Sequence, residues 1–263
     1  GRYQPDTQVR QAIDAIRGLA FNTLNLDFIY GIPGQTAETW LQTLVDAMVY
    51  EPEEIYLYPL YVRPQTGIGK KGYCELLENR LQLYRIGRQF LIENGYRQIS
   101  MRMFQQANRP QDQGPVYCCQ EDGLLGLGAG ARSYTQSVHY SSHYAVEKKS
   151  TIEVTKHYID EQNSGHTDVN YGIQLNDDEM RRRYIILSIL TLDGLSLSQY
   201  YQRFNSRLLE DFPKLTELTE AGFAVSHKEI IQLTEKGVEN SDSIGPWLYS
   251  QQVNNLVLRC EIK

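Results

Sequence analysis

The stretch from Leu24 to Thr36 restricts the fold more than any other part of the chain. Residues 24–30 are largely apolar and β-prone, and the Gly-Ile-Pro-Gly segment at 31–34 cannot continue a strand. Thr36 then opens an amphipathic run, with Glu38 close behind it, which is a helix-start signal. The pattern predicts a buried strand, a tight loop and a helix. In parallel α/β folds, ligands bind where such strands end.

One carboxylate, Asp27, interrupts the apolar strand. Burying a carboxylate costs several kcal/mol unless a partner compensates for the lost hydration. A structural salt bridge or cap would explain Asp27, and so would a bound ligand. The residues alone leave both explanations open.

A second predicted strand and further helices follow the strand, loop and helix at 24–36. Residues 55–61 read as a second strand, and strand, helix and strand at this spacing predict a βαβ unit with a parallel pair. Apolar spacing predicts helices over residues 5–20 and 75–93. Alternation predicts one strand over residues 96–104.

Composition excludes several classes of protein. Lys and Arg total 26 against 32 Asp and Glu, and the net charge of −6 argues against non-specific binding to nucleic acid. No apolar run approaches membrane-spanning length. Four cysteines without framework spacing predict a reducing, cytoplasmic setting; they are Cys74, Cys118, Cys119 and Cys260.

A glycine-rich motif, Gly-Leu-Gly-Ala-Gly-Ala, occupies residues 126–131. Such glycines let the backbone approach a ligand or another strand closely, and packing is the commoner use. The spacing does not fit a dinucleotide-binding loop. Downstream, His139 and His143 would share one face of a helix, but no third ligand is evident, so metal binding is not predicted.

The character of the chain changes near residue 150. Helices are predicted over 152–162, 177–192, 196–204 and 208–221, and a hairpin over 223–226 and 230–233. Helices followed by a small hairpin resemble a winged-helix module. Frequent Asp and Glu in this part argue against DNA binding.

Two motifs together carry a resemblance to a family. Asn-Leu-Asp-Phe-Ile-Tyr-Gly-Ile-Pro-Gly-Gln-Thr at 25–36 and the glycine motif at 126–131 resemble the oxygen-independent coproporphyrinogen III oxidases, radical S-adenosylmethionine proteins with a heme-chaperone branch. Residues 177–237 are similar to the C-terminal domain of that family. The resemblance implies an α/β fold. It places the C-terminal part of a partial (β/α)6 barrel at residues 1–145 and a small, winged-helix-like α+β domain at 146–263.

The family's chemistry starts at three cysteines spaced Cys-x3-Cys-x2-Cys, which hold a 4Fe-4S cluster. This sequence has no such motif. The resemblance therefore implies that the first four strands are missing or that the cluster has been lost. Missing strands would leave an open parallel edge, so the 263 residues alone are expected to be poorly soluble or dependent on a partner.

The resemblance also implies a set of cofactor-binding residues. Arg2 falls where the family has an arginine that contacts S-adenosylmethionine, although a frayed terminus would also explain it. Asp27 falls at the aspartate that holds the cofactor's polar groups, and Tyr61 where backbone lies beside the adenine. Gly128 and Arg132 fall in a loop that closes over the site. Because the oxidases have an apolar residue at the Arg132 position, Arg132 could instead meet a substrate carboxylate.

Two functions follow from the resemblance. In the first, a complete chain uses its 4Fe-4S cluster and S-adenosylmethionine to generate a 5′-deoxyadenosyl radical that abstracts hydrogen. Its expected partners are a small-molecule substrate, porphyrin-like or heme, and a reductant protein, and these 263 residues alone are expected to be inactive. In the second, the chain is a heme-binding chaperone without oxidase activity, with His139, His143, Cys118 or Cys119 as an iron ligand.

Overall fold

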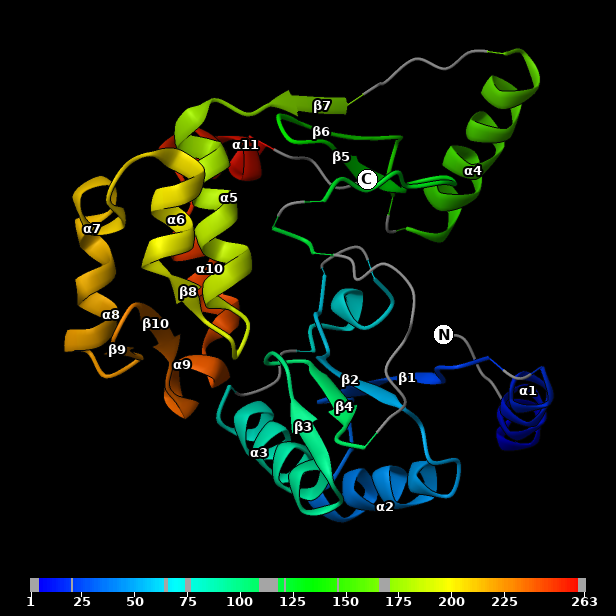
Figure 1. Cartoon of the computed structure of the whole chain (residues 1–263). Helices are drawn as coiled ribbons and strands as arrows, with labels where there is room; N and C mark the ends of the chain where they lie inside the picture. Colours follow the sequence, from blue (N-terminus) through cyan, green and yellow to red (C-terminus); the bar gives the residue numbers. More distant parts are fainter. Residues whose placement is uncertain are drawn as a thin grey trace. The chain divides into compact units, whose positions relative to one another are not determined.

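The computed structural model describes residues 5–19, 21–63, 66–73, 77–108, 118–120, 122–145, 147–165 and 171–259. The chain forms two compact units (Figure 1). Unit 1 comprises residues 1–63, 67–115 and 191–193, and unit 2 comprises residues 64–66, 116–190 and 194–263.

Unit 1 is built on a four-stranded mixed sheet. Its strands are β1 (Asn25–Tyr30), β2 (Glu54–Pro59), β3 (Tyr96–Gln98) and β4 (Met103–Gln106), in the order β1-β2-β4-β3. β1 and β2 are parallel, with Asp27 opposite Tyr56, whereas β4 is antiparallel to both β2 and β3. The predicted βαβ unit is therefore confirmed. No closed barrel occurs among the described residues.

Helices cover one face of this sheet. α2 (Ala37–Met48) connects β1 to β2, and α3 (Leu77–Glu93) precedes β3 (Figure 1). Trp40 of α2 is fully buried, and its indole N–H donates to the carbonyl of Leu83 in α3 at 2.9 Å. The core side chains Ile55, Leu57 and Phe104 project from the sheet on this covered side. α1 (Asp6–Gly18) is joined to the start of β2 by the Arg17–Glu53 ion pair at 2.9 Å.

The predicted single strand over 96–104 is wrong. Ser100 ends the pairing of β3, and its hydroxyl accepts hydrogen bonds from the backbone N–H groups of Arg102 and Met103 at 3.3 and 3.2 Å. The chain reverses there and returns as β4. The alternating pattern of residues 96–104 did not reveal this turn, because both strands of the hairpin continue the same alternation.

Unit 2 combines two small sheets with helices. β5 (Arg132–Tyr134), β6 (Val138–Ser141) and β7 (Tyr171–Gln174) form an antiparallel sheet, with α4 (Lys148–Asn163) between β6 and β7 in the chain. His139 thus lies on a strand, so the helical alignment considered for His139 and His143 does not occur. A tight turn at 135–138 joins β5 to β6, and the Thr135 N–H closes it by donating to the Val138 carbonyl at 2.8 Å. His139 therefore follows the turn as part of a hairpin strand.

The C-terminal part of unit 2 confirms the predicted hairpin and the helices predicted over 177–192 and 196–204, but not the single helix over 208–221. α5 (Asp177–Ile189) leads through β8 (Leu195–Ser196) to α6 (Leu197–Phe204). β9 (Ala224–His227) and β10 (Ile230–Leu233) pair antiparallel, and β8 joins β10. The predicted helix over 208–221 is instead α7 (Leu208–Asp211), the 3-10 turn η2 (Pro213–Leu215) and α8 (Thr216–Glu220), because Pro213 cannot continue a helix. α9 (Glu235–Glu239), α10 (Ser241–Trp247) and α11 (Gln251–Arg259) complete the chain.

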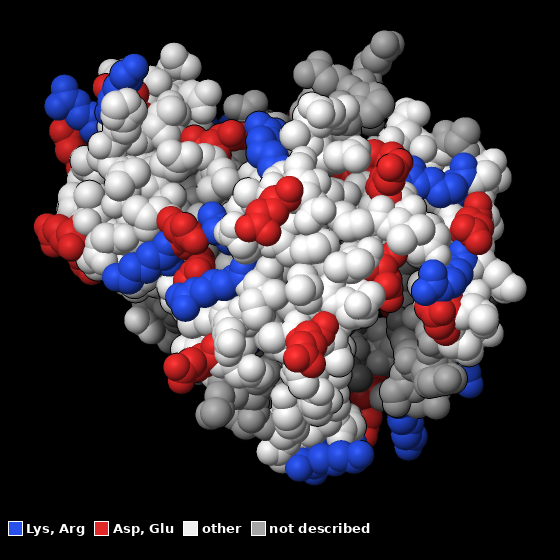
Figure 2. Space-filling model, turned by 90° about the horizontal axis from the view of Figure 1, so that it is seen from below, with Lys and Arg blue, Asp and Glu red and all other residues white. Residues whose placement is uncertain are grey.

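Charge is mixed on the face of the molecule shown in Figure 2, where basic and acidic side chains are interspersed. None of the helices in the described ranges is both long enough and apolar enough to cross a membrane. The described surface features therefore identify neither a basic stripe on that face nor a helical membrane segment.

A substitution at Gly237 of α9 tests how closely this helix approaches the backbone just before the hairpin. A Cβ added there would lie 2.0 Å from the backbone oxygen of Phe223. We expect Gly237→Ala to lower the free energy of unfolding by about 3 kcal/mol, the upper part of the usual cost of overpacking. Urea denaturation followed by circular dichroism measures the change.

Gly245→Ala is the matched control, in a helix of the same unit. Its added Cβ would meet Leu190 at an ordinary 3.5 Å, and alanine favours a helix over glycine by about 0.5–1 kcal/mol. We expect Gly245→Ala to be neutral or stabilising. Equal losses in the two variants would contradict the close approach at Gly237.

Candidate functional site

The first candidate site is the face of the unit 1 sheet opposite α2 and α3. In-register neighbours of a parallel pair point to the same side, so Asp27 and Tyr56 share this face, as do Ile29 and Tyr58. Asp27 is exposed, and Ile29 is 50% exposed. The expected burial of Asp27 is therefore wrong. Within unit 1 the helices lie on the other side of the sheet, and Asp27 keeps its hydration.

Aromatic side chains line this face beside Asp27. The rings of Tyr56 and Tyr58 stack with their centroids 6.0 Å apart and their planes 10° from parallel. Burial raises the pKa of both phenols, and the negative charge of Asp27 adds to the rise. Both hydroxyls therefore stay protonated at neutral pH and can donate hydrogen bonds. The Asn25 side-chain N–H donates to Asp27 at 3.1 Å, which orients one carboxylate oxygen.

Tyr61 lies just beyond the end of β2 and is 49% exposed. Its hydroxyl accepts a hydrogen bond from Arg102 Nη2 at 2.8 Å, and the same guanidinium stacks over the rings of Tyr58 and Tyr61. Arg102 thus joins the loop after β2 to the turn before β4. Sequence reasoning did not single out Arg102. Its only signal was a lone arginine between two methionines, Met101 and Met103.

The remaining predicted cofactor residues are not tested as one site by the structure. Arg2 is outside the described residues. Gly128 and Arg132 belong to unit 2, whereas Asp27 and Tyr61 belong to unit 1, so the structure provides no single described site for the set. Gly128 has a φ of 111°, and its N–H donates to the Tyr158 hydroxyl at 3.2 Å. Arg132 is exposed at the start of β5.

The glycine motif packs the backbone closely. A Cβ at Gly126 would lie 2.4 Å from the carbonyl oxygen of Arg132, so only glycine fits there. The Gly126 N–H donates to the Ser133 hydroxyl at 2.9 Å, and the Gly130 N–H donates to Ser142 at 2.7 Å. These backbone donors are used within the chain, which favours the packing explanation for the motif.

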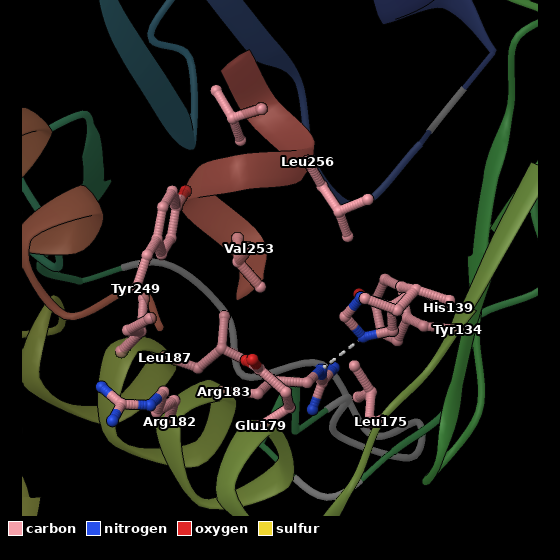
Figure 3. Close-up of a pocket in the computed structure, with 13 residues that line it drawn as sticks. Tyr134, His139, Leu175, Glu179, Arg182, Arg183, Leu187, Tyr249, Val253 and Leu256 are labelled. Atoms are coloured by element: carbon pink, nitrogen blue, oxygen red, sulfur yellow. Dashed lines mark hydrogen bonds between the residues drawn. The ribbon is translucent and has the colours of Figure 1, made fainter. Parts of the chain in front are cut away.

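Unit 2 contains a second candidate site that sequence reasoning missed, centred on Arg183 of α5 (Figure 3). Its Nε donates to His139 Nε2 at 3.1 Å, its Nη2 donates to the Cys119 carbonyl at 3.0 Å, and its guanidinium lies 4.7 Å from the centroid of Tyr134. Burial, and then the charge of Arg183, lower the pKa of His139 below its usual value. The Arg-Arg-Arg run at 181–183 was the only sequence signal for this site.

A metal cofactor has little support from these side chains. Within the described ranges, no cluster of three or more His, Cys, Asp or Glu side chains could hold a metal ion. Cys118 and Cys119 are free thiols, and burial raises the pKa of Cys119. The spacing of the four cysteines does not fit a Cys-x3-Cys-x2-Cys cluster site. The Asp27 face, by contrast, suits a ligand with hydroxyl or ammonium groups, because a carboxylate accepts strong hydrogen bonds from both.

Comparisons with known proteins point to one family. Residues 175–239 match the model of the HemN C-terminal domain. The heme chaperone HemW of Bacillus subtilis is 24% identical over 248 residues, which cover 90% of this chain and 62% of that protein. The oxygen-independent coproporphyrinogen III oxidase of Escherichia coli K12 is 27% identical, covering 90% of this chain and 54% of the oxidase. The chain is therefore similar to the HemN and HemW proteins, and residues 175–239 match the C-terminal domain of HemN.

A solved structure supports the same fold. Coproporphyrinogen III oxidase (HemN) from Escherichia coli, described as a radical SAM enzyme, matches with a TM-score of 0.73 at 22% identity. The match covers 94% of this chain and 59% of that one. Over 94% of its length the chain thus has the fold of the matched part of that oxidase, and it spans between 54% and 62% of the lengths of the proteins compared.

The Arg183–His139 hydrogen bond predicts how stability responds to pH. His139 Nε2 must be unprotonated to accept from Arg183, and its pKa in the folded state lies below that of the unfolded chain. The unfolded state then binds more protons as pH falls through the usual histidine range, so folding stability decreases with falling pH. We expect His139→Gln, which keeps an acceptor, to reduce this loss between about pH 7.5 and pH 5.5.

Urea denaturation of both proteins across this pH interval measures the effect. His227→Gln, on the β9 strand of the same unit, is the control and should retain the slope of the parent chain. Parallel pH profiles for the parent chain and His139→Gln would contradict a depressed pKa at His139.

Proposed function

We propose that the uncovered sheet face of unit 1 binds S-adenosylmethionine as part of a radical S-adenosylmethionine protein resembling the oxygen-independent coproporphyrinogen III oxidases. The observation that carries the proposal is Asp27, an exposed carboxylate at the centre of a strand within the family motif and flanked by stacked tyrosines. The similarity to HemN and HemW proteins and the match to part of the HemN fold support it.

Within this proposal each side chain has a defined task. Asp27 accepts hydrogen bonds from ribose hydroxyls or from the ammonium group of the cofactor. Tyr56 and Tyr58 offer an apolar surface with protonated hydroxyls, which suits the wall of a cavity for a small substrate of the porphyrin or heme class. Arg102 holds Tyr61 at the end of β2, where the backbone would lie beside the adenine.

The bound cofactor, with a 4Fe-4S cluster and a reductant protein, would supply hydrogen abstraction from the substrate. The cysteines in these 263 residues do not fit the cluster, so activity is proposed only for a protein that provides it. Arg2, Gly128 and Arg132 remain proposed cofactor contacts. The proposed setting is a reducing cytoplasm, which the free thiols of Cys118 and Cys119 support.

Binding of S-adenosylmethionine tests the role of Asp27. We expect Asp27→Asn to weaken binding by about tenfold or more, because a charge-assisted hydrogen bond is lost and its replacement is nearly isosteric. Equilibrium dialysis of the complete gene product against radiolabelled S-adenosylmethionine measures the affinity.

Glu38→Gln is the matched control for charge. Glu38 is an exposed carboxylate in the first turn of α2, outside the Asp27 face, and its loss should leave the affinity unchanged. Equal affinity of the parent protein and Asp27→Asn for S-adenosylmethionine would contradict the assignment of Asp27.

A heme-chaperone function is the second proposal, and the similarity to HemW of Bacillus subtilis favours it. His139 is a poor ligand through Nε2, because that nitrogen accepts from Arg183. His143 is half-buried and packs edge-on against Tyr171, with ring centroids 4.9 Å apart. Cys118 and Cys119 are the other candidate ligands.

Heme titration separates the second proposal from the first. A chaperone would develop a saturable Soret band, and His143→Ala or Cys118→Ala would diminish or shift it. His227→Ala is the control histidine. A Soret change that is indifferent to all of these ligand substitutions would contradict specific heme ligation by these residues.

A further inference from the structure

Unit 2 contains an apolar cavity of about 550 Å³ between α5, the β5-β6-β7 sheet and α11 (Figure 3). Aliphatic side chains from all three elements form its walls: Ile173, Leu175, Ile186, Leu187, Val253, Leu256 and Val257. This volume lies within the range of small-molecule sites, which are mostly apolar with a few placed polar groups. The family match does not account for such a cavity.

Arg183 is one of the polar groups on the cavity wall, next to Glu179 and His139 (Figure 3). Its three contacts are the neutral His139, a backbone carbonyl and the Tyr134 ring, and it makes no ion pair within the described part of the chain. Its Nη1 makes no hydrogen bond there either. A half-buried guanidinium without a carboxylate partner favours an anionic ligand, because charge-assisted hydrogen bonds offset its desolvation.

Arg182 cannot take this role as readily. Its Nε is paired with Asp178 at 2.7 Å, its Nη1 donates to the Leu248 carbonyl at 2.9 Å, and its guanidinium stacks over Phe212. Arg182 is thus neutralised by Asp178, whereas Glu179, the carboxylate among the lining residues, makes no ion pair with Arg183 in the described part of the chain. Arg183 is therefore the lining cation that lacks a carboxylate partner there and keeps an unused donor.

Glu179 holds the wall of the cavity in place. It is 6% exposed, and its carboxylate accepts a hydrogen bond from the Ser250 hydroxyl. Ser250 in turn accepts from the Val253 N–H at 3.0 Å, which caps the first turn of α11. The chain of contacts from α5 to α11 keeps the apolar face of α11 over the cavity.

We propose that this cavity binds an anionic amphiphile, with its apolar body between α5 and α11 and its single anionic group hydrogen-bonded to Arg183. No residue that lines the cavity belongs to the Asp27 face, whose residues are all in unit 1. The proposal therefore stands or falls independently of S-adenosylmethionine binding.

The fluorescent probe 1-anilinonaphthalene-8-sulfonate tests the cavity, because it joins apolar rings to one sulfonate. We expect saturable binding to the complete gene product with one strong site. Leu256→Trp should weaken this binding about tenfold by filling the space that the probe needs. Leu258→Trp is the matched control, since Leu258 lies on the same helix, is 83% exposed and does not line the cavity.

Competition tests the anionic group. Laurate should displace the probe, and dodecanol, which has the same chain without the charge, should require about tenfold more ligand. Equal displacement by the two would overturn the assignment of Arg183. Equal probe affinity in Leu256→Trp and Leu258→Trp would overturn the proposal that the ligand binds in this cavity.

A folding control keeps the test decisive, since the probe also binds loosely packed chains. Both tryptophan variants must show the cooperative melt of the parent chain. If Leu256→Trp does not, Val257→Trp replaces it, because Val257 lines the same cavity and is 59% exposed. Unchanged probe affinity in a folded Val257→Trp would overturn the proposal.

Discussion

The guanidinium of Arg183 is the contact on which the arrangement of unit 2 depends. It joins three segments that are far apart in the chain: α5, the 118–120 turn and β6. Its neighbours in the sequence project to other partners, with Arg181 paired to Asp211 and Arg182 to Asp178 and the Leu248 carbonyl. Because a helix turns its side chains by about 100° per residue, three consecutive arginines stabilise three different interfaces of one helix. This explains how a charged run lies within a packed helical domain.

Unit 1 depends on a different constraint, the period of two along its strands. One set of alternate residues on β1 and β2 forms the core with Trp40, and the other set, which includes Asp27 and Tyr56, faces away from the helices. A shift of register by one residue would bury Asp27 and expose Leu26 and Phe28. The hydrophobic pattern therefore determines on which face a ligand of unit 1 would bind. β1 pairs only with β2 in the described sheet, so β1 is an edge strand there.

The two candidate sites differ in how visible they are in the sequence. Asp27 is conspicuous because a carboxylate interrupts an apolar strand inside a specific motif. Arg183 and the apolar cavity are not conspicuous, because residues from α5, three short strands and α11 form the cavity together. Leucines and valines spaced over 80 residues look like ordinary core positions until tertiary packing leaves a space between them.

The sequence by itself determined most of the local elements and the resemblance to the coproporphyrinogen III oxidases. Apolar periodicity, the turn at 31–34 and the hairpin around Lys228 are consequences of interactions between near neighbours, and the structure has them where the pattern predicts. Only the tertiary structure decided that residues 96–106 form a hairpin, that His139 lies on a strand and that Asp27 is exposed. Each of these depends on a contact between distant segments or on which face of a sheet the helices cover. Alternation along a strand specifies two faces, but packing against the rest of the chain decides which face is buried.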